Sequence, residues 1–489
     1  MSEQVTAIVL AAGAGTRMKS RRAKVLHEVA GRSMIEHALQ AVAGVGAQRT
    51  VAVVGHQREQ VTEAVSTAHP EVLLAVQEEQ RGTGHAVAIA LDALDGAIDG
   101  RVEGTVLVTY ADVPLLTGET LTTLVAEHRD AGRAVTILSS EVADPRGYGR
   151  ILRDADGAVT AIREDRDATE AERAVSEINS GILAVDAAFL ARAVRSLDSG
   201  NAQGELYLTD IVSAAVGEGL PVGAHVLEDV WQTEGVNDRA QLARLGRELN
   251  RRLVAHWMAE GVTVVDPATT WIDSMVSIGA DTTIHPGTQL LGATSIGEGA
   301  TIGPDTTLVN LEVGDDASVV RTHATDAVIG AGATVGPFSY LRPGTVLEAG
   351  AKVGAFVEVK NSTIGEGAKV PHLSYVGDAD VGEGANVGAG TVFANYDGET
   401  KHRSRIGRHA RTASNNTFVA PVEVGDGAFT GAGATIREDV PPGALAVSAG
   451  PQRTMGGWVA RKRPGSASAE AAERAAGQSE PSDGAAPGE

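Results

Sequence analysis

A glycine-containing turn follows the first strand-like segment of the chain, and two cationic side chains come after it. The segment ends at Leu10, Gly13 and Gly15 lie in the turn, and Arg17 and Lys24 follow. Backbone N–H groups in such a turn can approach phosphate oxygens, and the two cations would offset the charge of a triphosphate. The pattern matches neither the dinucleotide fingerprint nor the Walker A loop, and glycines after a strand more often form a plain tight turn. Further residues must therefore decide between the two interpretations.

Asp112 lies at the end of a second buried, strand-like run, which covers residues 107–111. Ligands of open α/β sheets gather at the carboxyl ends of the strands. A single carboxylate there would suit Mg²⁺, because substrate phosphates supply most of the other ligands of that ion. A helix cap or a turn explains a lone Asp equally well, so both interpretations stay open at this point.

A second group of polar residues lies in the C-terminal half, at places where the surrounding sequence pattern does not require them. The group consists of Arg342, Lys360, His372, Tyr375 and Asn386. His372 could act as a general base, because an imidazole titrates near neutral pH. A lone histidine is more often a surface or internally satisfied residue, and a pure scaffold is the more common role of the repeats described below.

Alternating strand-like and helix-like segments must position the first group. Short apolar runs predict strands at residues 7–10, 50–54, 72–76 and 105–108. Helix-like stretches lie between them, at residues 34–42 and 85–94. Such alternation predicts an α/β domain with a mostly parallel sheet. Leucines at three- and four-residue spacing then predict one long helix, with Asp238 as N-cap and Gly261 as stop.

The second group lies within a six-residue repeat that extends from about Trp271 to Val447. Apolar residues recur at every sixth position from Ile278 to Leu308 without a slip, and glycine often follows them. Neither a helix nor a flat strand has this period, whereas a strand–turn unit wound around a triangular prism does. A glycine-rich surface of loops would not keep so many apolar residues in phase. The repeat is interrupted between Phe393 and Ile406, and an inserted loop usually builds a binding face.

Composition limits the classes of function. The 489 residues are too many for one core, and the net charge of −22 argues against nucleic-acid partners and anionic membranes. The absence of cysteine fits a reducing cytoplasm. No apolar run is long enough for membrane insertion, and no signal segment precedes the first strand. The Ala-, Gly-, Ser-, Pro- and Glu-rich residues 464–489 are predicted to be disordered.

Over residues 5–240 the chain resembles the sugar-phosphate nucleotidyltransferases. Further matching segments are 77–86, 148–151, 178–182, 205–210 and 234–238. By this resemblance Arg17 and Lys24 would be catalytic cations, and Asp112 and Asn237 would hold Mg²⁺. The nucleotide and sugar would be bound by Leu10, Ala11, Ala12, Gly13, Lys24, Gln77, Gly82, Thr83, Tyr110, Ala111, Asp112, Gly149, Glu164, Asn179 and Asn237. The uridyltransferase branch usually has glycine at the position of Ala111, whose methyl group we expect beside the nucleotide.

The C-terminal half closely resembles the acetyltransferase half of the bifunctional N-acetylglucosamine-1-phosphate uridyltransferase / glucosamine-1-phosphate acetyltransferase family. The resemblance makes His372 the general base. It assigns the acetyl acceptor to Arg342, Lys360, Tyr375 and Asn386, and acetyl-CoA to Ala389, Asn395, Tyr396, Ser414 and Ala432. Family members often have arginine where this chain has Ala449. Arg453 or a residue of the run 461–463 could supply that charge.

The fold class predicted from both resemblances is α/β, a Rossmann-like nucleotidyltransferase domain followed by a left-handed parallel β-helix of hexapeptide repeats. Its parts would be the uridyltransferase domain (1–237), a linker helix (238–261), the acetyltransferase β-helix (262–463) and the tail (464–489). The resemblance implies a cytoplasmic homotrimer that uses Mg²⁺, UTP, acetyl-CoA, glucosamine 1-phosphate and N-acetylglucosamine 1-phosphate in peptidoglycan synthesis. Two alternatives are a single-activity nucleotidyltransferase with a structural or regulatory β-helix and a trimeric scaffold with an inactive N-terminal domain.

Overall fold

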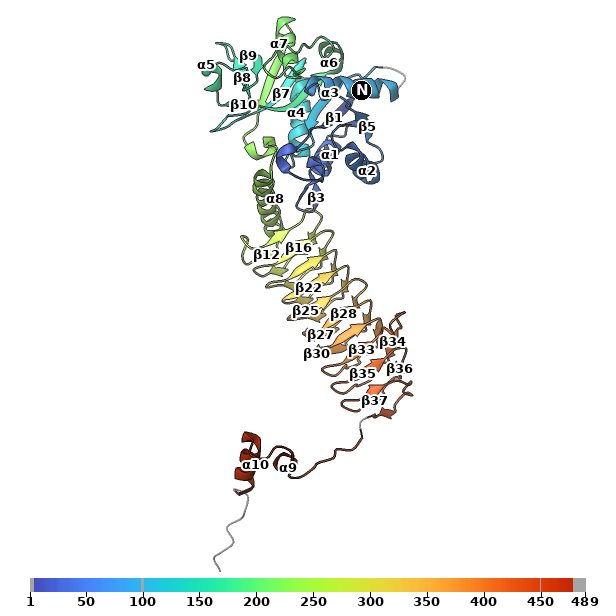
Figure 1. Ribbon diagram of the computed structural model, residues 1–489. Coiled ribbons are helices and arrows are strands. Elements are labelled where there is room, and N and C mark those ends of the chain that lie inside the picture. Colours follow the sequence, from blue (N-terminus) through green and yellow to red (C-terminus); the bar gives the residue numbers. More distant parts are fainter. Residues whose placement is uncertain (1–3, 98–100, 449, 478–489) are drawn as a thin grey trace, which may run out of the picture.

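A computed structural model describes residues 4–97, 101–448 and 450–477 of the chain. An α/β domain, a long helix and a narrow prism of short strands follow one another along the molecule (Figure 1). The prism leads to two short C-terminal helices. Among the described residues, none of the helices combines the length and the apolar character needed to span a membrane.

The α/β domain is built on a sheet with the strand order β11-β7-β10-β6-β1-β4-β5. The strands are β1 (Val5–Ala11), β4 (Arg49–Val54), β5 (Leu73–Val76), β6 (Thr105–Tyr110), β7 (Val135–Glu141), β10 (Glu177–Asp186) and β11 (Val222–Val226). Neighbouring strands are parallel except at β10, which is antiparallel to both β6 and β7. The same sheet continues into the hairpin of β8 (Gly149–Arg153) and β9 (Val159–Arg163), because β8 pairs with β10. The small hairpin of β2 (Glu28–Val29) and β3 (Arg32–Ser33) is separate from it.

Helices cover both faces of this sheet, which explains why the strands are apolar without alternation. One face packs against α1 (Met34–Gly44), α2 (Arg58–Ala68) and α4 (Gly118–Asp130). The other face packs against α3 (Thr83–Ala97), α6 (Ala187–Ala193) and α7 (Asp210–Gly217). Four short helices lie in the connections: η1 (Thr16–Met18), η2 (Lys24–Leu26), η3 (Val230–Thr233) and α5 (Glu170–Arg173).

The prism consists of three parallel sheets, one for each face, whose strands follow one another in turn around the axis. The first sheet contains β12 (Thr263–Val264), β15 (Thr283–Ile284), β18 (Thr301–Ile302), β21 (Ser318–Val319), β24 (Thr334–Val335), β27 (Lys352–Ala355) and β30 (Lys369–His372). The second contains β13 (Trp271–Ile272), β16 (Gln289–Leu291), β19 (Thr307–Val309), β22 (Thr322–Thr325), β25 (Ser339–Leu341), β28 (Glu358–Lys360), β31 (Tyr375–Gly377), β33 (Val392–Ala394), β35 (Thr417–Val419) and β38 (Thr435–Ile436). The third contains β14 (Ser277–Ile278), β17 (Ser295–Ile296), β20 (Glu312–Val313), β23 (Val328–Ile329), β26 (Val346–Leu347), β29 (Thr363–Ile364), β32 (Ala379–Val381), β34 (Ser404–Ile406) and β36 (Glu423–Val424), and β37 (Phe429–Thr430) pairs with β39 (Leu445–Ala446).

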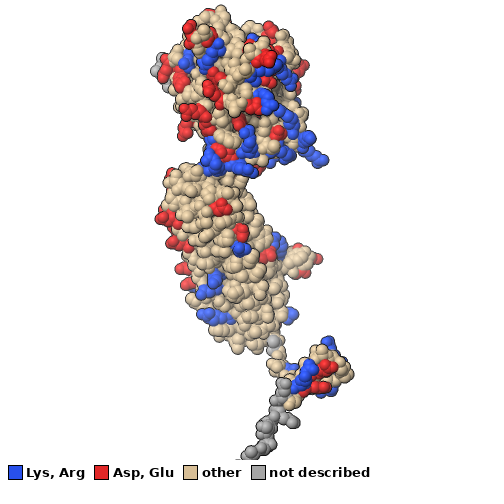
Figure 2. Space-filling model, turned by 90° about the vertical axis from the view of Figure 1, so that its left-hand side faces the viewer, with Lys and Arg blue, Asp and Glu red and all other residues tan. Residues whose placement is uncertain are grey.

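The six-residue repeat is the cause of this architecture. Its apolar residues face the interior and stack in register on the next coil, as Ile278 does on Ile296 and Ile296 on Val313. These side chains form one continuous core along the prism. Five-residue steps, such as the one between Leu308 and Val313, shorten individual coils without breaking the register. The predicted fold class, an α/β domain followed by a left-handed parallel β-helix, is confirmed. Figure 2 shows few charged side chains on one broad face of the prism.

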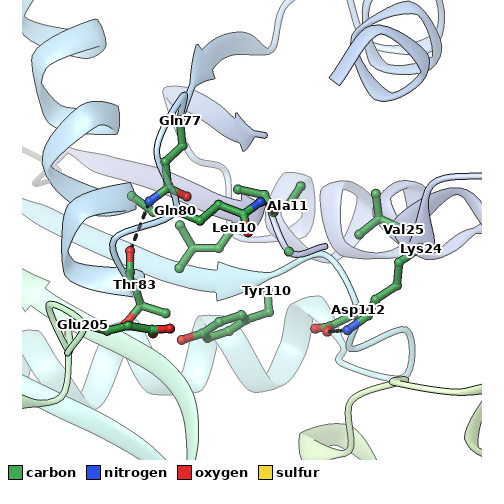
Figure 3. A pocket seen from close by; sticks show the side chains of 14 residues that line it. Leu10, Ala11, Lys24, Val25, Gln77, Gln80, Thr83, Tyr110, Asp112 and Glu205 are labelled. Carbon is green, nitrogen blue, oxygen red and sulfur yellow. Dashed lines mark hydrogen bonds and ion pairs between the residues drawn. The ribbon is translucent and has the colours of Figure 1, made fainter. Parts of the chain in front are cut away.

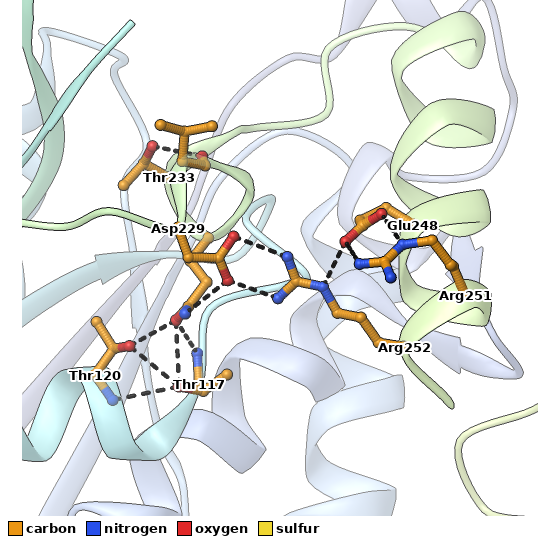
Figure 4. A network of polar contacts seen from close by, with 9 residues as sticks. Thr117, Thr120, Asp229, Thr233, Glu248, Arg251 and Arg252 are labelled. Carbon is orange, nitrogen blue, oxygen red and sulfur yellow. Dashed lines mark hydrogen bonds and ion pairs between the residues drawn. The ribbon is translucent and has the colours of Figure 1, made fainter. Parts of the chain in front are cut away.

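Helix α8 (Arg239–Ala259) joins the two parts and is anchored to both. Asn250 donates to the carbonyl of Thr270 at 2.9 Å and accepts from the N–H of Ile272 at 2.8 Å, on the first coil. Two residues further along α8, Arg252 pairs with Asp229 of the α/β domain and with Glu248 (Figure 4). The helix begins after Asn237, where the side chain of the N-cap residue Asp238 accepts from the N–H of Gln241.

The tail differs from its prediction. Helix α9 (Trp458–Lys462) precedes it, and α10 (Ala467–Gly477) lies within residues 464–489. The prediction of disorder is therefore wrong for residues 467–477. Too little apolar surface for a core does not prevent local helix formation, and alanine is the strongest helix former. Residues 478–489 lie outside the described residues.

Candidate active sites

The turn after β1 forms one wall of a cavity of about 280 Å³ at the carboxyl ends of the strands (Figure 3). All ten of the following predicted nucleotide-binding residues line it: Leu10, Ala11, Ala12, Gly13, Lys24, Gln77, Gly82, Thr83, Tyr110 and Asp112. Gly15 has a φ of 58°, and a Cβ there would lie 2.5 Å from the Cβ of Lys24. The turn therefore needs glycine in order to lie against Lys24.

A second cavity, of about 430 Å³, adjoins the first and shares Thr83, Tyr110, Asp112 and Glu205 with it. All the remaining predicted residues of this half except Ala111 line it, namely Arg17, Gly149, Glu164, Asn179 and Asn237. Two ligands could thus lie side by side and meet at Asp112. This is the arrangement that group transfer between them requires.

Burial raises the pKa of the Glu164 carboxyl, although the hydroxyl of Thr209 donates to it at 3.0 Å. The carboxylates of Asp210, Asp167 and Asp165 raise this pKa further. A ligand with hydroxyl groups would supply donors that Glu164 otherwise lacks, because a buried carboxylate is stabilised by hydrogen bonds.

Two oxygen ligands converge on one point beside both cavities. The Nζ of Lys24 lies 2.5 Å from Oδ2 of Asp112 and 3.1 Å from Oδ1 of Asn237. Among the described residues, no three His, Cys, Asp or Glu side chains are placed so that they could hold a metal ion together. A carboxylate and an amide oxygen that already share one cation nevertheless fit Mg²⁺, which binds through few protein oxygens when phosphates complete its shell.

Ala111 is the predicted residue that the structure places elsewhere. Its side chain is fully buried in the core between the sheet and helices α1, α2 and α4, and it lines neither cavity. The expectation of a methyl group beside the nucleotide is therefore wrong. The alternation of side chains along β6 continues past the strand, so Tyr110 and Asp112 face the cavities and Ala111 faces away.

Sequence reasoning missed several lining residues. Gln80 donates to the carbonyl of Ala12 at 2.7 Å and so supports the turn after β1. Gly181 has a φ of 83°, and a Cβ there would lie 2.5 Å from the ring of Tyr110. Glu205 and Tyr207 also line the second cavity. The segments that contain Gln80, Gly181, Glu205 and Tyr207 were recognised, but their individual roles depend on contacts across the fold.

The polar residues of the β-helix gather at one edge of the prism. His372 ends β30 and Tyr375 begins β31, so they flank the corner at Leu373. Asn386 pairs with Lys369 on the next coil. The N–H of Gly390, next to Ala389, donates to the carbonyl of His372 at 3.3 Å.

The remaining predicted residues extend this edge. The N–H of Asn415, beside Ser414, donates to Ala389, and the N–H of Gly433, beside Ala432, donates to Ser414. A ligand lying along the edge could reach His372 and all of these coils. Ala449 lies outside the described residues, and Arg453 and residues 461–463 follow the last strand, β39.

Asp378 organises the polar side chains next to this edge. It is buried and accepts from Asn361 at 2.6 Å, from Asn395, and from Lys360 at 3.5 Å. Burial alone would raise the pKa of Asp378, but the hydrogen bonds from Asn361 and Asn395 and the charge of Lys360 hold it below its usual value. The charged carboxylate therefore fixes the inserted loop, through Asn395, to the coil that contains Lys360.

Lys401 is a cation that the sequence interpretation did not assign. The Lys360 ammonium beside it lowers the pKa of Lys401, and Arg342 lowers it further. Arg342 itself is paired with Glu358 at 2.9 Å. Two coils and the inserted loop thus bring together three cations that influence one another, a grouping that suits a phosphate group. The inserted loop was recognised as a candidate binding segment, but the position of Lys401 could not be predicted because the repeat is interrupted there.

Comparison with known families agrees with this geometry. Residues 6–238 match the nucleotidyl transferase family, and residues 275–310 and 326–361 match the bacterial transferase hexapeptide (six repeats) family. The chain therefore combines a nucleotidyl transferase domain with a hexapeptide-repeat domain of the transferase type.

Similarity to individual relatives covers nearly the whole chain. Bifunctional protein GlmU of Corynebacterium glutamicum is 57% identical over 472 residues, which are 96% of each chain. The Thermobifida fusca protein of the same name is 60% identical over 479 residues, 98% of this chain and 99% of the relative. That of Mycolicibacterium gilvum is 59% identical over 470 residues, 95% and 94% of the two chains. The chain belongs to the family of the bifunctional GlmU proteins.

Proposed function

We propose that this chain is a bifunctional enzyme of UDP-N-acetylglucosamine synthesis. It acetylates glucosamine 1-phosphate with acetyl-CoA, and it transfers uridylyl from UTP to N-acetylglucosamine 1-phosphate with release of pyrophosphate. Two observations support the proposal: the two cavities of the α/β domain meet at Asp112, and the cations Lys360, Lys401 and Arg342 of the β-helix interact with one another. Assay of both reactions with the purified chain tests the proposal, and the absence of acetyl transfer would leave a single-activity nucleotidyltransferase.

In the uridylyl transfer, a phosphate oxygen of the sugar 1-phosphate attacks the α-phosphorus of UTP. One P–O bond forms and the bond to pyrophosphate breaks, so no protein nucleophile is needed. UTP lies in the first cavity, against the turn at Gly13, and Gln77 and Thr83 bind the base. The sugar phosphate lies in the second cavity beside Gly149, Glu164 and Asn179.

Positioning and charge supply the catalysis of this step. Arg17 and Lys24 offset the negative charge that develops on the phosphate oxygens. Mg²⁺, held by Asp112 and Asn237, supplies further neutralisation when bound. The domain division that we propose is the one expected from the sequence. It consists of the uridyltransferase domain (1–237), the linker helix (238–261), the acetyltransferase β-helix (262–463) and the tail (464–489).

In the acetyl transfer, the neutral amine of glucosamine 1-phosphate attacks the thioester carbonyl of acetyl-CoA. His372 accepts the proton that the amine loses, and the CoA thiolate leaves. Arg342, Lys360 and Lys401 bind the phosphate, and Tyr375 and Asn386 hold the sugar. Acetyl-CoA lies along the edge formed by Ala389, Ser414 and Ala432, with Asn395 and Tyr396 beside it.

Lys401 provides a test of the phosphate subsite. We expect Lys401→Gln to raise the KM for glucosamine 1-phosphate about tenfold or more, because a charge-assisted hydrogen bond is worth about 1.5–3 kcal/mol. The kcat should change little, since Lys401 is remote from the reacting amine. Steady-state kinetics at saturating acetyl-CoA measures both, with Lys352→Gln, an exposed lysine at the start of β27, as the control. An unchanged KM would remove Lys401 from the subsite.

A homotrimer is the assembly that we propose, in the cytoplasm of a bacterium. Phe338, Phe356 and Leu373 occupy one corner of three successive coils and expose 53%, 59% and 64% of their surface. The rings of Phe338 and Phe356 stack at 5.2 Å. An apolar column of this kind beside His372 favours a neighbouring copy that covers it and shares the acetyltransferase site.

The column can be tested by sedimentation. We expect Phe356→Glu combined with Leu373→Glu to shift the protein from trimer to monomer, because each buried contact would then bring a carboxylate into an apolar interface. Acetyl transfer should be lost and uridylyl transfer should persist. Glu348→Gln, at an exposed corner of another edge, serves as the control. A wild-type monomer with full acetyl transfer would refute the trimer.

A further inference from the structure

A third cavity, of about 320 Å³, lies at the end of the α/β sheet opposite to the nucleotide cavity. Thr105 begins β6 at this cavity, whereas Tyr110 ends β6 at the other one. The end of β10 at Asp186 and the segment before β11 at Pro221 also line it. None of the residues proposed above for either reaction is part of its wall.

Cationic side chains dominate this wall. Among the described residues of this wall, Arg129, Arg133 and Arg192 occur together with one acidic residue, Asp186. Burial lowers the pKa of His128, also in the wall, to about 4, so this imidazole is neutral at pH 7. Arg192 is paired with Glu218 at 2.6 Å. The wall is thus positive at pH 7, in a chain whose net charge is −22.

Arg133 is the residue that indicates a binding site for a ligand. Its Nη1 is buried and has no hydrogen-bond partner among the described residues. Its guanidinium lies against Gly223 of β11, where an added Cβ would be 2.5 Å from Cζ. Arginine cannot lose its charge inside proteins, and a buried donor without a partner is costly. The Oδ1 of Asp186 accepts from the N–H of Phe189 at 2.8 Å.

We propose that this cavity binds a small inorganic phosphate, either orthophosphate or pyrophosphate. Planar guanidinium groups match phosphate oxygens in geometry as well as charge, and several arginines around one cavity favour a doubly charged anion over a carboxylate. The volume is at the lower end of the range of ligand pockets and is sufficient for either anion. Gly223 allows Arg133 its position in the wall, because any side chain at residue 223 would displace the guanidinium.

Calorimetric titration of orthophosphate, and separately of pyrophosphate, into the full-length protein tests the site. The catalytic cavities also bind these anions, so the comparison is between variants. We expect Arg133→Gln to lose one binding site per chain and Gly223→Ala to weaken that site at least tenfold. Arg49→Gln, an exposed residue at the same end of the sheet on β4, should equal the wild type. The anion that binds more tightly to the site that is lost in Arg133→Gln identifies the ligand.

Thermal unfolding separates this role from a structural one. Without phosphate, Arg133→Gln should unfold at the wild-type temperature or above it, because it removes an unpartnered buried charge. Addition of phosphate should raise the unfolding temperature of the wild type more than that of the variant. A lower unfolding temperature of the variant without phosphate, or the same number and affinity of sites in all four proteins, would overturn the proposal.

Discussion

Replacement of His372 by alanine should abolish acetyl transfer and leave uridylyl transfer near the wild-type rate. General-base catalysis by a positioned side chain contributes about 10²–10⁴-fold, and the fall in kcat for acetyl transfer should lie in this range. His372 is exposed at the end of β30, and its side chain supports no part of the core, so the variant should fold normally. The two reactions are measured in parallel on the same preparation.

His323→Ala is the matched control for this variant. His323 is an exposed histidine of β22, on coils that precede the site. It should retain both activities. Loss of both activities in a folded His372 variant would contradict two independent sites, and retention of acetyl transfer would require another base. Asp397 and His402 of the inserted loop contact each other at 2.7 Å and would then be the groups to examine.

The repeat explains why the fold could be predicted so fully. Each apolar residue of the series, such as Ile284 or Val353, is buried and pairs with its equivalent on the next coil. One short period therefore determines both the local turn and the long-range contact. In the α/β domain, continuous apolar runs such as Val5–Ala11 indicated strands buried on both faces, but the antiparallel insertion of β10 between β6 and β7 has no comparable signal.

The candidate sites were predictable where a motif directly follows a strand or occupies a coil. Leu10 and Asp112 lie at strand ends, so the strand itself carries them to the cavities. Lys401 escaped prediction because its position depends on the fold of the inserted loop, which Asp378 fixes through Asn395. The methyl group of Ala111 was expected at the nucleotide because sequence adjacency to Asp112 does not indicate which face of the sheet a side chain occupies.

The surroundings of Arg133 could not be predicted from the sequence for a related reason. Arg133 lies in the segment between α4 and β7, Arg192 lies in α6 and Gly223 lies in β11, and the fold of the whole domain brings them together. No spacing within the sequence links them. A site whose residues come together only in the tertiary structure, unlike a motif at the end of a strand, can be recognised only in the three-dimensional structure.

Replacement of Asp112 by alanine should have the converse effect of the His372 variant, with loss of uridylyl transfer and retention of acetyl transfer. Asp112 lines both cavities, and its Oδ2 lies 2.5 Å from the Nζ of Lys24. Its removal therefore takes away a proposed ligand of Mg²⁺ and leaves Lys24 without its carboxylate partner. The loss of a group that stabilises charge in the transition state costs about 10²–10³-fold in kcat. Pyrophosphate release at saturating substrates measures this loss.

A second readout distinguishes the metal role from general disruption of the site. With Asp112→Asn, which preserves the size of the side chain, the Mg²⁺ concentration for half-maximal uridylyl transfer should rise, because one negative ligand has become neutral. Asp156→Asn, an exposed residue in the β8–β9 turn, should leave the Mg²⁺ requirement unchanged. If Asp112→Asn lowered kcat without changing the Mg²⁺ requirement, Asp112 would act only through Lys24. Full uridylyl transfer by a folded Asp112→Ala protein would place the chemistry elsewhere in the α/β domain.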